Sequence, residues 1–156
     1  MADDPGNRSR AYAAAGALFL DEAGRIMLVE PTYKEDWEIP GGNVESGETP
    51  VQACAREVRE ELGLDVVVGR LLVADWAPHP ERGDKVLFVF DGGMLTAAQL
   101  ADITLQADEL ASYAFFDPTE AAEVLVPRLG CRVAAALEAR CTGVTAYLEH
   151  GLPHPG

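Results

Sequence analysis

Positive charge is scarce in this 156-residue sequence, which has 12 Lys and Arg residues against 26 Asp and Glu residues and a net charge of −14. Such an acidic excess repels nucleic-acid backbones and anionic membrane surfaces. We therefore expect no nucleic-acid partner and no membrane partner. The balance suits action on small molecules, and an anionic small molecule would have to arrive with a metal ion. Apolar runs of about 18 residues are also absent, so we expect no transmembrane helix.

Cysteine and histidine are too few and too scattered to suggest a metal site of their own. The three cysteines lack metal-ligand spacing, and an odd, sparse set indicates reduced thiols and a cytoplasmic location. The three histidines show no ligand spacing either. These residues are Cys54, Cys131, Cys141, His79, His150 and His154. The polar first ten residues lack the apolar core of a signal peptide, so we expect no leader there.

The chain length favours one domain. We expect residues 1–10 to form a disordered arm, residues 11–150 a single domain and residues 151–156 a tail. Apolar stretches predict strands at residues 12–20, 25–30, 66–77, 86–90 and 111–116, with the first two paired as a hairpin. Proline and cap signals predict helices that begin near residues 50, 118 and 127. This order favours an α+β fold, an α/β/α sandwich around a mixed β-sheet, over a doubly wound parallel sheet.

Carboxylates are concentrated in residues 42–64, GNVESGETPVQACAREVREELGL, a segment with glycines towards both ends. Thr49 and Pro50 predict the start of a helix there, and Gly63 predicts its end. At 3.6 residues per turn, three glutamates share one helix face: Glu57, Glu60 and Glu61. The neighbouring arc, which we expect to face the core, contains Val51, Ala55, Val58 and Leu62. Clustered like charges disfavour one another unless a cation intervenes, and carboxylate and carbonyl oxygens are what Mg²⁺ or Mn²⁺ prefers.

The same segment resembles the Nudix box, G-x5-E-x7-R-E-U-x-E-E-x-G-U, where U is aliphatic. All nine fixed positions are filled, by Gly42, Glu48, Arg56, Glu57, Val58, Glu60, Glu61, Gly63 and Leu64. The preceding WEIPGG resembles the family's lead-in to the box. Nine matches at fixed spacing are highly specific. The resemblance implies a Nudix-type α/β/α sandwich with a loop–helix–loop catalytic segment, over nearly the whole chain.

The resemblance also implies an activity and the roles of particular residues. Family members hydrolyse a nucleoside diphosphate linked to another group, with Mg²⁺ or alternatively Mn²⁺ as cofactor. By matching positions, Glu57, Glu60 and Glu61 would hold the metal ions, with the Gly41 carbonyl as a further ligand. Arg56 would orient these carboxylates, and Glu48 would brace the loop–helix–loop.

The general base is often supplied from outside the box in this family. Glu109, just ahead of the strand expected at residues 111–116, is the first candidate. Its rival is Glu57 itself, and Asp84 and Asp108 are weaker candidates. The number of metal ions and the identity of the base stay open at this stage.

Substrate contacts are expected from the loops around the box. Tyr33 and Trp37 could stack on a base, although a Trp next to a Pro is more often a packing residue. Many family members have an arginine after the second strand, where this chain has Glu30 and Pro31. The expected replacements for that phosphate contact are Lys34, Arg82 and Lys85.

The substrate itself stays open among three hypotheses. Pro78 and Pro80 lie where family members that cleave ADP-ribose often carry a proline, so a nucleotide-sugar such as ADP-ribose is weakly favoured. A nucleoside triphosphate pyrophosphatase that sanitises the nucleotide pool is the alternative enzyme. A non-catalytic nucleotide-sensing module is the alternative from another class, and the complete box argues against it. A homodimer is left open.

Overall fold

A computed structural model of the chain describes residues 5–156. The first four residues of the arm expected at residues 1–10 lie outside this description, and a short 3-10 helix follows at Pro5–Asn7. The strands are β1 Ala11–Leu20, β2 Ile26–Pro31, β3 Gly41–Asn43, β4 Leu71–Ala77, β5 Asp84–Met94, β6 Leu110–Phe116, β7 Ala146–Glu149 and β8 Leu152–Pro153. The helices are α1 Pro50–Leu62, α2 Ala97–Ala101, α3 Pro118–Val124 and α4 Pro127–Thr142. No helix among these residues is long and apolar enough to cross a membrane.

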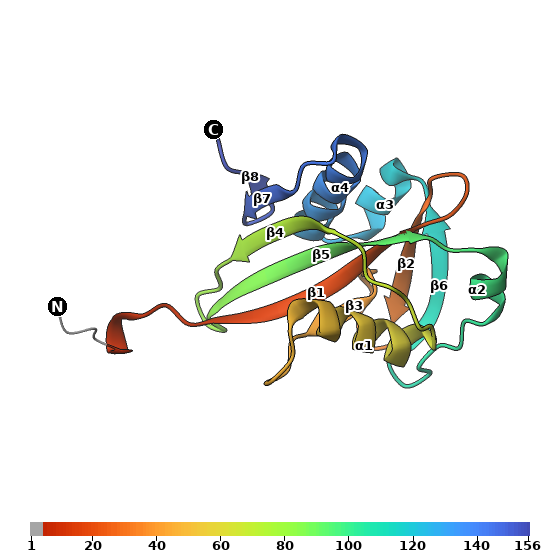
Figure 1. The fold of residues 1–156 in the computed structure, drawn as a ribbon, viewed down its shortest axis with the longest axis horizontal. Coiled ribbons are helices and arrows are strands. Elements are labelled where there is room, and N and C mark those ends of the chain that lie inside the picture. The colour runs from red at the N-terminus through yellow and green to blue at the C-terminus, as the bar shows by residue number, and fades with distance from the viewer. Residues whose placement is uncertain (1–4) are drawn as a thin grey trace.

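Within residues 5–156 the strands form one eight-stranded mixed sheet. Its order is β6-β2-β1-β5-β4-β7-β8, with β3 paired to β1 off this path. The pairs β1–β5 and β4–β7 are parallel, and the remaining pairs are antiparallel. Helix α1 covers one face of the sheet, and α3 and α4 cover the other (Figure 1). The predicted α+β sandwich with a mixed sheet is therefore confirmed.

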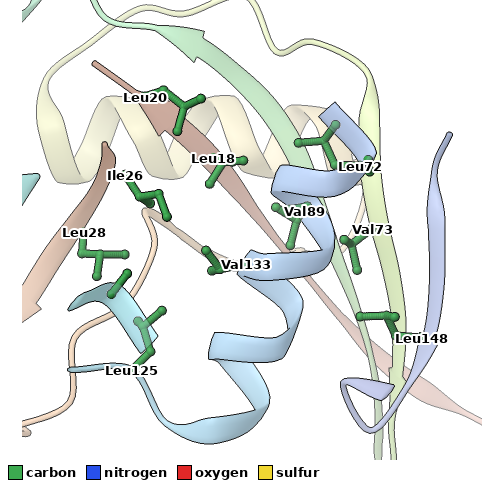
Figure 2. Close-up of a cluster of buried hydrophobic side chains, with 13 residues drawn as sticks. Leu18, Leu20, Ile26, Leu28, Leu72, Val73, Val89, Leu125, Val133 and Leu148 are labelled. Carbon is green, nitrogen blue, oxygen red and sulfur yellow. The ribbon is translucent and has the colours of Figure 1, made fainter. Parts of the chain in front are cut away.

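Each face of the sheet has its own hydrophobic core because β1 is apolar on both sides. Leu18 and Leu20 belong to the cluster under α3 and α4, together with Val133 of α4. Figure 2 shows this cluster, in which side chains from the sheet point towards α4. Ala17 and Phe19 belong to the opposite cluster, under α1. A strand buried on both faces is a continuous apolar run, as the sequence of β1 is.

The predicted hairpin of β1 and β2 forms, but its two strands separate away from the turn. They pair at Leu20 and Ile26. Farther along, residues 38–44 run between the two strands. The Val29 and Glu38 backbones bond to each other, whereas Gly41–Asn43 pairs with β1. This inserted segment leads directly into α1, so the separation of β1 from β2 positions the loop and helix that the Nudix box encodes.

The start and end of α1 follow the sequence signals. The Thr49 hydroxyl accepts a hydrogen bond from the Gln52 backbone N–H (3.2 Å), and the Gln52 side chain accepts one from the Thr49 N–H (2.9 Å). This reciprocal pair is a capping box. Gly63 ends the helix with φ of 69°, which a glycine adopts without strain. Val58 and Leu62 are buried as expected, but the prediction for Val51 is wrong, because its side chain is 44% exposed.

Several elements differ from their predicted bounds. The strand predicted over residues 66–77 begins only at Leu71, and Val66 and Val68 pack instead against the core under α1. The Gly69 N–H still donates to the Asp91 carbonyl of β5 at 2.8 Å. Strand β5 extends to Met94 instead of ending at residue 90. Strands β3 and β7 and helix α2 were not predicted. Strand β8 falls inside the expected tail, where it pairs with β7.

Candidate active site

Three residues of the box, Gly42, Glu57 and Glu61, line a cavity of about 420 Å³ where β1, β3 and β5 meet α1 and α4. Both acidic and basic side chains line it. The acidic side chains are Glu38, Glu57, Glu61 and Glu109, and the basic ones are Lys85 and Arg132. Tyr33 and the backbone of Gly41 and Gly42 complete the part of the wall that concerns the chemistry.

Glu61 is the most deeply buried of these acids. Its carboxylate accepts a hydrogen bond from the Gly41 backbone N–H (3.1 Å). Burial raises the pKa of Glu61 to about 8, and nearby carboxylates, first among them Glu57, add to the effect. The hydrogen bond from Gly41 acts in the opposite direction but is outweighed. A carboxyl group held in this way is poised to gain a cation or a proton.

Gly41 and Gly42, where the lead-in meets the box, are required by close approach. A Cβ on Gly42 would overlap the carboxyl group of Glu57, and a Cβ on Gly41 would overlap the backbone of Ala15 and Gly16. The backbone of the lead-in thus lies directly against the carboxylates of α1.

Burial raises the pKa of Glu57, because it outweighs the opposing effect of the Arg56 hydrogen bond.

Arg56 connects the loop before α1 to the glutamates on the helix. Its guanidinium donates to both Glu48 oxygens (2.6 and 3.2 Å), to Glu57 (2.8 Å) and to Glu60 (3.1 Å). It also donates to the Asn43 carbonyl (3.0 Å). The hydrogen bond from Arg56 is the main reason that the pKa of Glu48 lies below its ordinary value. Arg56, which was expected to orient the carboxylates, and Glu48, which was expected to brace the loop–helix–loop, are therefore in direct contact through the Arg56 guanidinium.

The three expected metal ligands are not equivalent in the structure. Glu57 and Glu61 line the cavity, whereas the Glu60 side chain is 50% exposed and turned to Arg56. Among residues 5–156, no three His, Cys, Asp or Glu side chains are grouped closely enough to hold a metal ion as they stand. The donor chemistry still fits a hard divalent cation, because two carboxylates and the Gly41 peptide lie in one cavity. Glu60 would join them only after leaving Arg56.

Glu109 reaches the same cavity from the turn before β6. The Thr32 backbone N–H donates to the Glu109 carbonyl (2.8 Å), which ties this turn to the end of β2. The negative charge of Glu109 contributes to the raised pKa of Glu61. The weaker candidates Asp84 and Asp108 are not among the lining residues.

The residues expected to contact substrate divide into those at the cavity and those away from it. Tyr33 and Lys85 line it. Lys34 forms an ion pair with Glu38. Trp37 packs edge-on against Phe116, with ring centroids 5.0 Å apart, beside the core under α4. Arg82 lines a neighbouring cavity instead.

Sequence reasoning missed Arg132, which forms much of the basic wall together with Lys85. Its Nε pairs with the carboxylate of Asp75, a fully buried residue of β4. Asp75 also accepts a hydrogen bond from the Gly151 N–H (3.0 Å). The available signal was Asp75 itself, because a carboxylate within an apolar strand needs a partner. Nothing local in the sequence identifies Arg132, 57 residues later, as that partner.

The fold and the site together define a class of protein. It is an α/β/α sandwich in which a glutamate-rich loop–helix–loop borders a cavity lined by acidic and basic side chains. Residues 11–133 match the NUDIX domain. The chain belongs to the NUDIX family.

Several known proteins share this domain with the chain. The chain is 39% identical to human 8-oxo-dGDP phosphatase NUDT18 over 100 residues, 58% of this chain and 29% of that protein. It is 32% identical to Escherichia coli CTP pyrophosphohydrolase over 111 residues, 67% of this chain and 76% of that protein. The chain thus spans about a third or less of the length of the NUDT18 relatives from human and mouse.

Solved structures show the same fold. The crystal structure of a UDP-X diphosphatase superposes with a TM-score of 0.71 at 21% identity, covering 92% of this chain and 70% of that one. The solution structure of the Escherichia coli ORF135 protein has a TM-score of 0.67 at 26% identity, covering 86% and 94%.

Proposed function

We propose that this protein hydrolyses a phosphoanhydride bond in a nucleotide, cleaving a nucleoside diphosphate linked to another group. The observation that carries the proposal is a cavity lined by both signs of charge. Glu57 and Glu61 of the box line it, and so do Lys85 of β5 and Arg132 of α4. A metal-bearing diphosphate matches both signs of charge, since its metal ion suits the carboxylates and its free oxygens suit the cations.

We propose Mg²⁺ as the cofactor, with Mn²⁺ as a substitute. Glu57, Glu61 and the Gly41 carbonyl would hold it, and Glu60 would be recruited from Arg56. When bound, the ion supplies charge neutralisation for the diphosphate and acidifies a water molecule. Arg56 keeps the Glu57 carboxylate oriented through its 2.8 Å bond while remaining anchored on Glu48.

The remaining steps fall to side chains on the other walls. Lys85 and Arg132 would position the diphosphate oxygens for in-line attack. Glu109 would take the proton from the attacking water as general base, with Glu57 as the rival for that role. Tyr33, which lines the cavity, would contact the nucleoside. Three free cysteines accord with a cytoplasmic location, which we also propose.

Two substrate classes remain for this site. A nucleotide-sugar such as ADP-ribose is the class that the sequence weakly favours. A nucleoside triphosphate is favoured by the relatives, whose names include a CTP pyrophosphohydrolase and an 8-oxo-dGTP diphosphatase. The two differ in products: the first yields two monophosphates, and the second yields pyrophosphate and one monophosphate.

A product screen tests the proposal. Nucleotide-sugars, dinucleoside polyphosphates and nucleoside triphosphates would be incubated with the protein and Mg²⁺, and the products separated by ion-exchange chromatography. We expect turnover that falls by orders of magnitude in Glu61→Gln and is retained in Glu123→Gln, an exposed acid of α3 outside the cavity. Nucleotide binding without turnover across the panel would favour the sensing module instead.

A further inference from the structure

A second cavity of about 640 Å³ borders the first one. Asn43 and Lys85 line both, so the two spaces share a wall. The second cavity lies between the start of β1, the loop joining β4 to β5, and the start of α4. Register supports this neighbourhood, because Ala11 of β1 pairs with Asp84 of β5. The starts of β1 and β5 lie side by side in Figure 1. Nothing in the function proposed above uses this space.

The second cavity is basic in a strongly acidic protein. Arg82, Lys85 and Arg128 line it, and no Asp or Glu side chain does. Across residues 5–156 these three side chains have no recorded ion pair or hydrogen bond. Most other basic residues of the protein are paired, as Arg25 is with Asp21. Acids outnumber bases by more than two to one in the whole sequence, so a cavity lined by three cations and no carboxylate suits an anion.

Local structure fixes the backbone turn that carries Arg82. The His79 ring nitrogen Nδ1 accepts hydrogen bonds from the Glu81 and Arg82 backbone N–H groups (3.1 and 3.0 Å). Gly83 closes the same turn with φ of 82°. Lys85 is half-buried, and burial is the main cause of its lowered pKa; the negative charge of Glu38 opposes this shift, and the positive charges of Arg132 and Arg82 add to it. An anion in this space would relieve that repulsion.

We propose that the second cavity binds a phosphate group that the substrate carries beyond its scissile pyrophosphate. Lys85, on the shared wall, would lie between the two phosphate positions, with Arg82 and Arg128 around the outer one. This inference rests on the proposed function, since it specifies the substrate class of that site: pyrophosphates that bear an additional phosphate. Guanidinium groups suit such a ligand because they donate in pairs to phosphate oxygens.

The first test measures binding without catalysis. Inorganic phosphate would be titrated into the metal-free protein and followed by ¹H–¹⁵N correlation spectra. We expect saturable shifts at the amides of Arg82, Gly83 and Arg128, lost in the double variant Arg82→Gln/Arg128→Gln. The control Arg25→Gln removes one positive charge at the β1–β2 turn and should keep the shifts. Absence of saturable shifts, or shifts confined to Gly41 and Gly42, would overturn the proposal.

The second test uses substrates that differ by one phosphate. Coenzyme A would be compared with dephospho-coenzyme A, and NADPH with NADH, by kcat/KM with Mg²⁺. We expect at least one pair to show a preference of roughly tenfold or more for the phosphorylated member, as for a charged hydrogen bond. Arg82→Gln and Arg128→Gln should reduce that preference while leaving the unphosphorylated member unaffected. Equal rates within both pairs, or equal losses on both members, would overturn it.

The two tests separate this inference from the function on which it rests. If no pyrophosphate in any panel is hydrolysed, the proposed function fails, and phosphate binding at Arg82 and Arg128 still decides whether the second cavity is an anion site. If hydrolysis occurs without phosphate binding there, the function stands and the second cavity has no role in substrate selection.

Discussion

At the scale of single residues, burial disfavours the charged form of the Glu57 and Glu61 carboxylates, and a bound cation would offset that cost. Glu61 is the clearest case, because its neighbours are mostly other acids and its burial removes water. The sequence predicted which glutamates share the helix face, and the structure places two of the three in the cavity. The sequence could not show that Glu60 turns outward, since that depends on the position of Arg56 in space.

The raised pKa of Glu61 makes the stability of the metal-free protein depend on pH. Its folded-state pKa of about 8 lies above the ordinary value of 4.5, so between these values the folded state binds more protons than the unfolded one. Stability should therefore fall as pH rises from about 4.5 to about 8 and change little through Glu61 above that range. Urea unfolding in EDTA at several pH values, for wild type and Glu61→Gln, measures this.

The comparison isolates Glu61 because the other titrating groups remain in both proteins. The difference in unfolding free energy between Glu61→Gln and wild type should increase in favour of the variant as pH rises through the window. Parallel pH curves for the two proteins would show that Glu61 titrates as an ordinary exposed acid.

Glu109 provides the test of the general base. A carboxylate in that role contributes roughly 10²–10⁴-fold to turnover, so Glu109→Gln should reduce kcat by about that factor with little change in KM. The acid limb of its pH–rate profile should also flatten. Asp108→Asn is the matched control, because Asp108 is adjacent in sequence but does not line the cavity. Full activity in Glu109→Gln, with activity abolished in Glu57→Gln, would place the base within the box.

At the scale of elements, α1 shows where sequence signals suffice and where they do not. Its start at Thr49 and Pro50 and its end at Gly63 are local, since caps and glycine conformations involve only a few consecutive residues. The false extension of β4 back to residue 66 arose because apolar residues there pack under α1 without joining the sheet. Strands β3 and β7 are three and four residues long, too short for a periodic signal.

The cap of α1 should connect stability to activity. Thr49→Ala removes the hydroxyl that accepts from Gln52, at a cost of about 0.5–2 kcal/mol. Because α1 carries the carboxylates, turnover should fall as well. Thr96→Ala is a matched control, since Thr96 and Gln99 form the same capping box at α2, away from the cavity. Thermal unfolding and kcat of both variants would be measured, and wild-type activity in Thr49→Ala would separate the cap from carboxylate placement.

At the scale of the whole molecule, the family and the sandwich were predictable from nine residues, and Lys85 was named as a phosphate contact, but Arg132 and its pairing with Asp75 were not. The box is a continuous segment, so its match is visible in the sequence. Lys85, Arg132 and Asp75 come from β5, α4 and β4, which meet only after the sheet has formed and α4 has packed on it. Long-range pairing of this kind leaves no local pattern.

The pair of Asp75 and Arg132 joins the core under α4 to the active-site cavity, and it yields the last prediction. Asp75 is fully buried and holds both Arg132 and the Gly151 N–H. Asp75→Asn leaves the Arg132 charge without its partner, so unfolding free energy should fall by about 3–5 kcal/mol. The double variant Asp75→Asn/Arg132→Met removes both charges and should recover much of that loss in urea unfolding. Its KM should nevertheless stay raised, because Arg132 faces the substrate phosphates in the proposed function. A double variant with restored stability and wild-type KM would show that Arg132 serves folding alone.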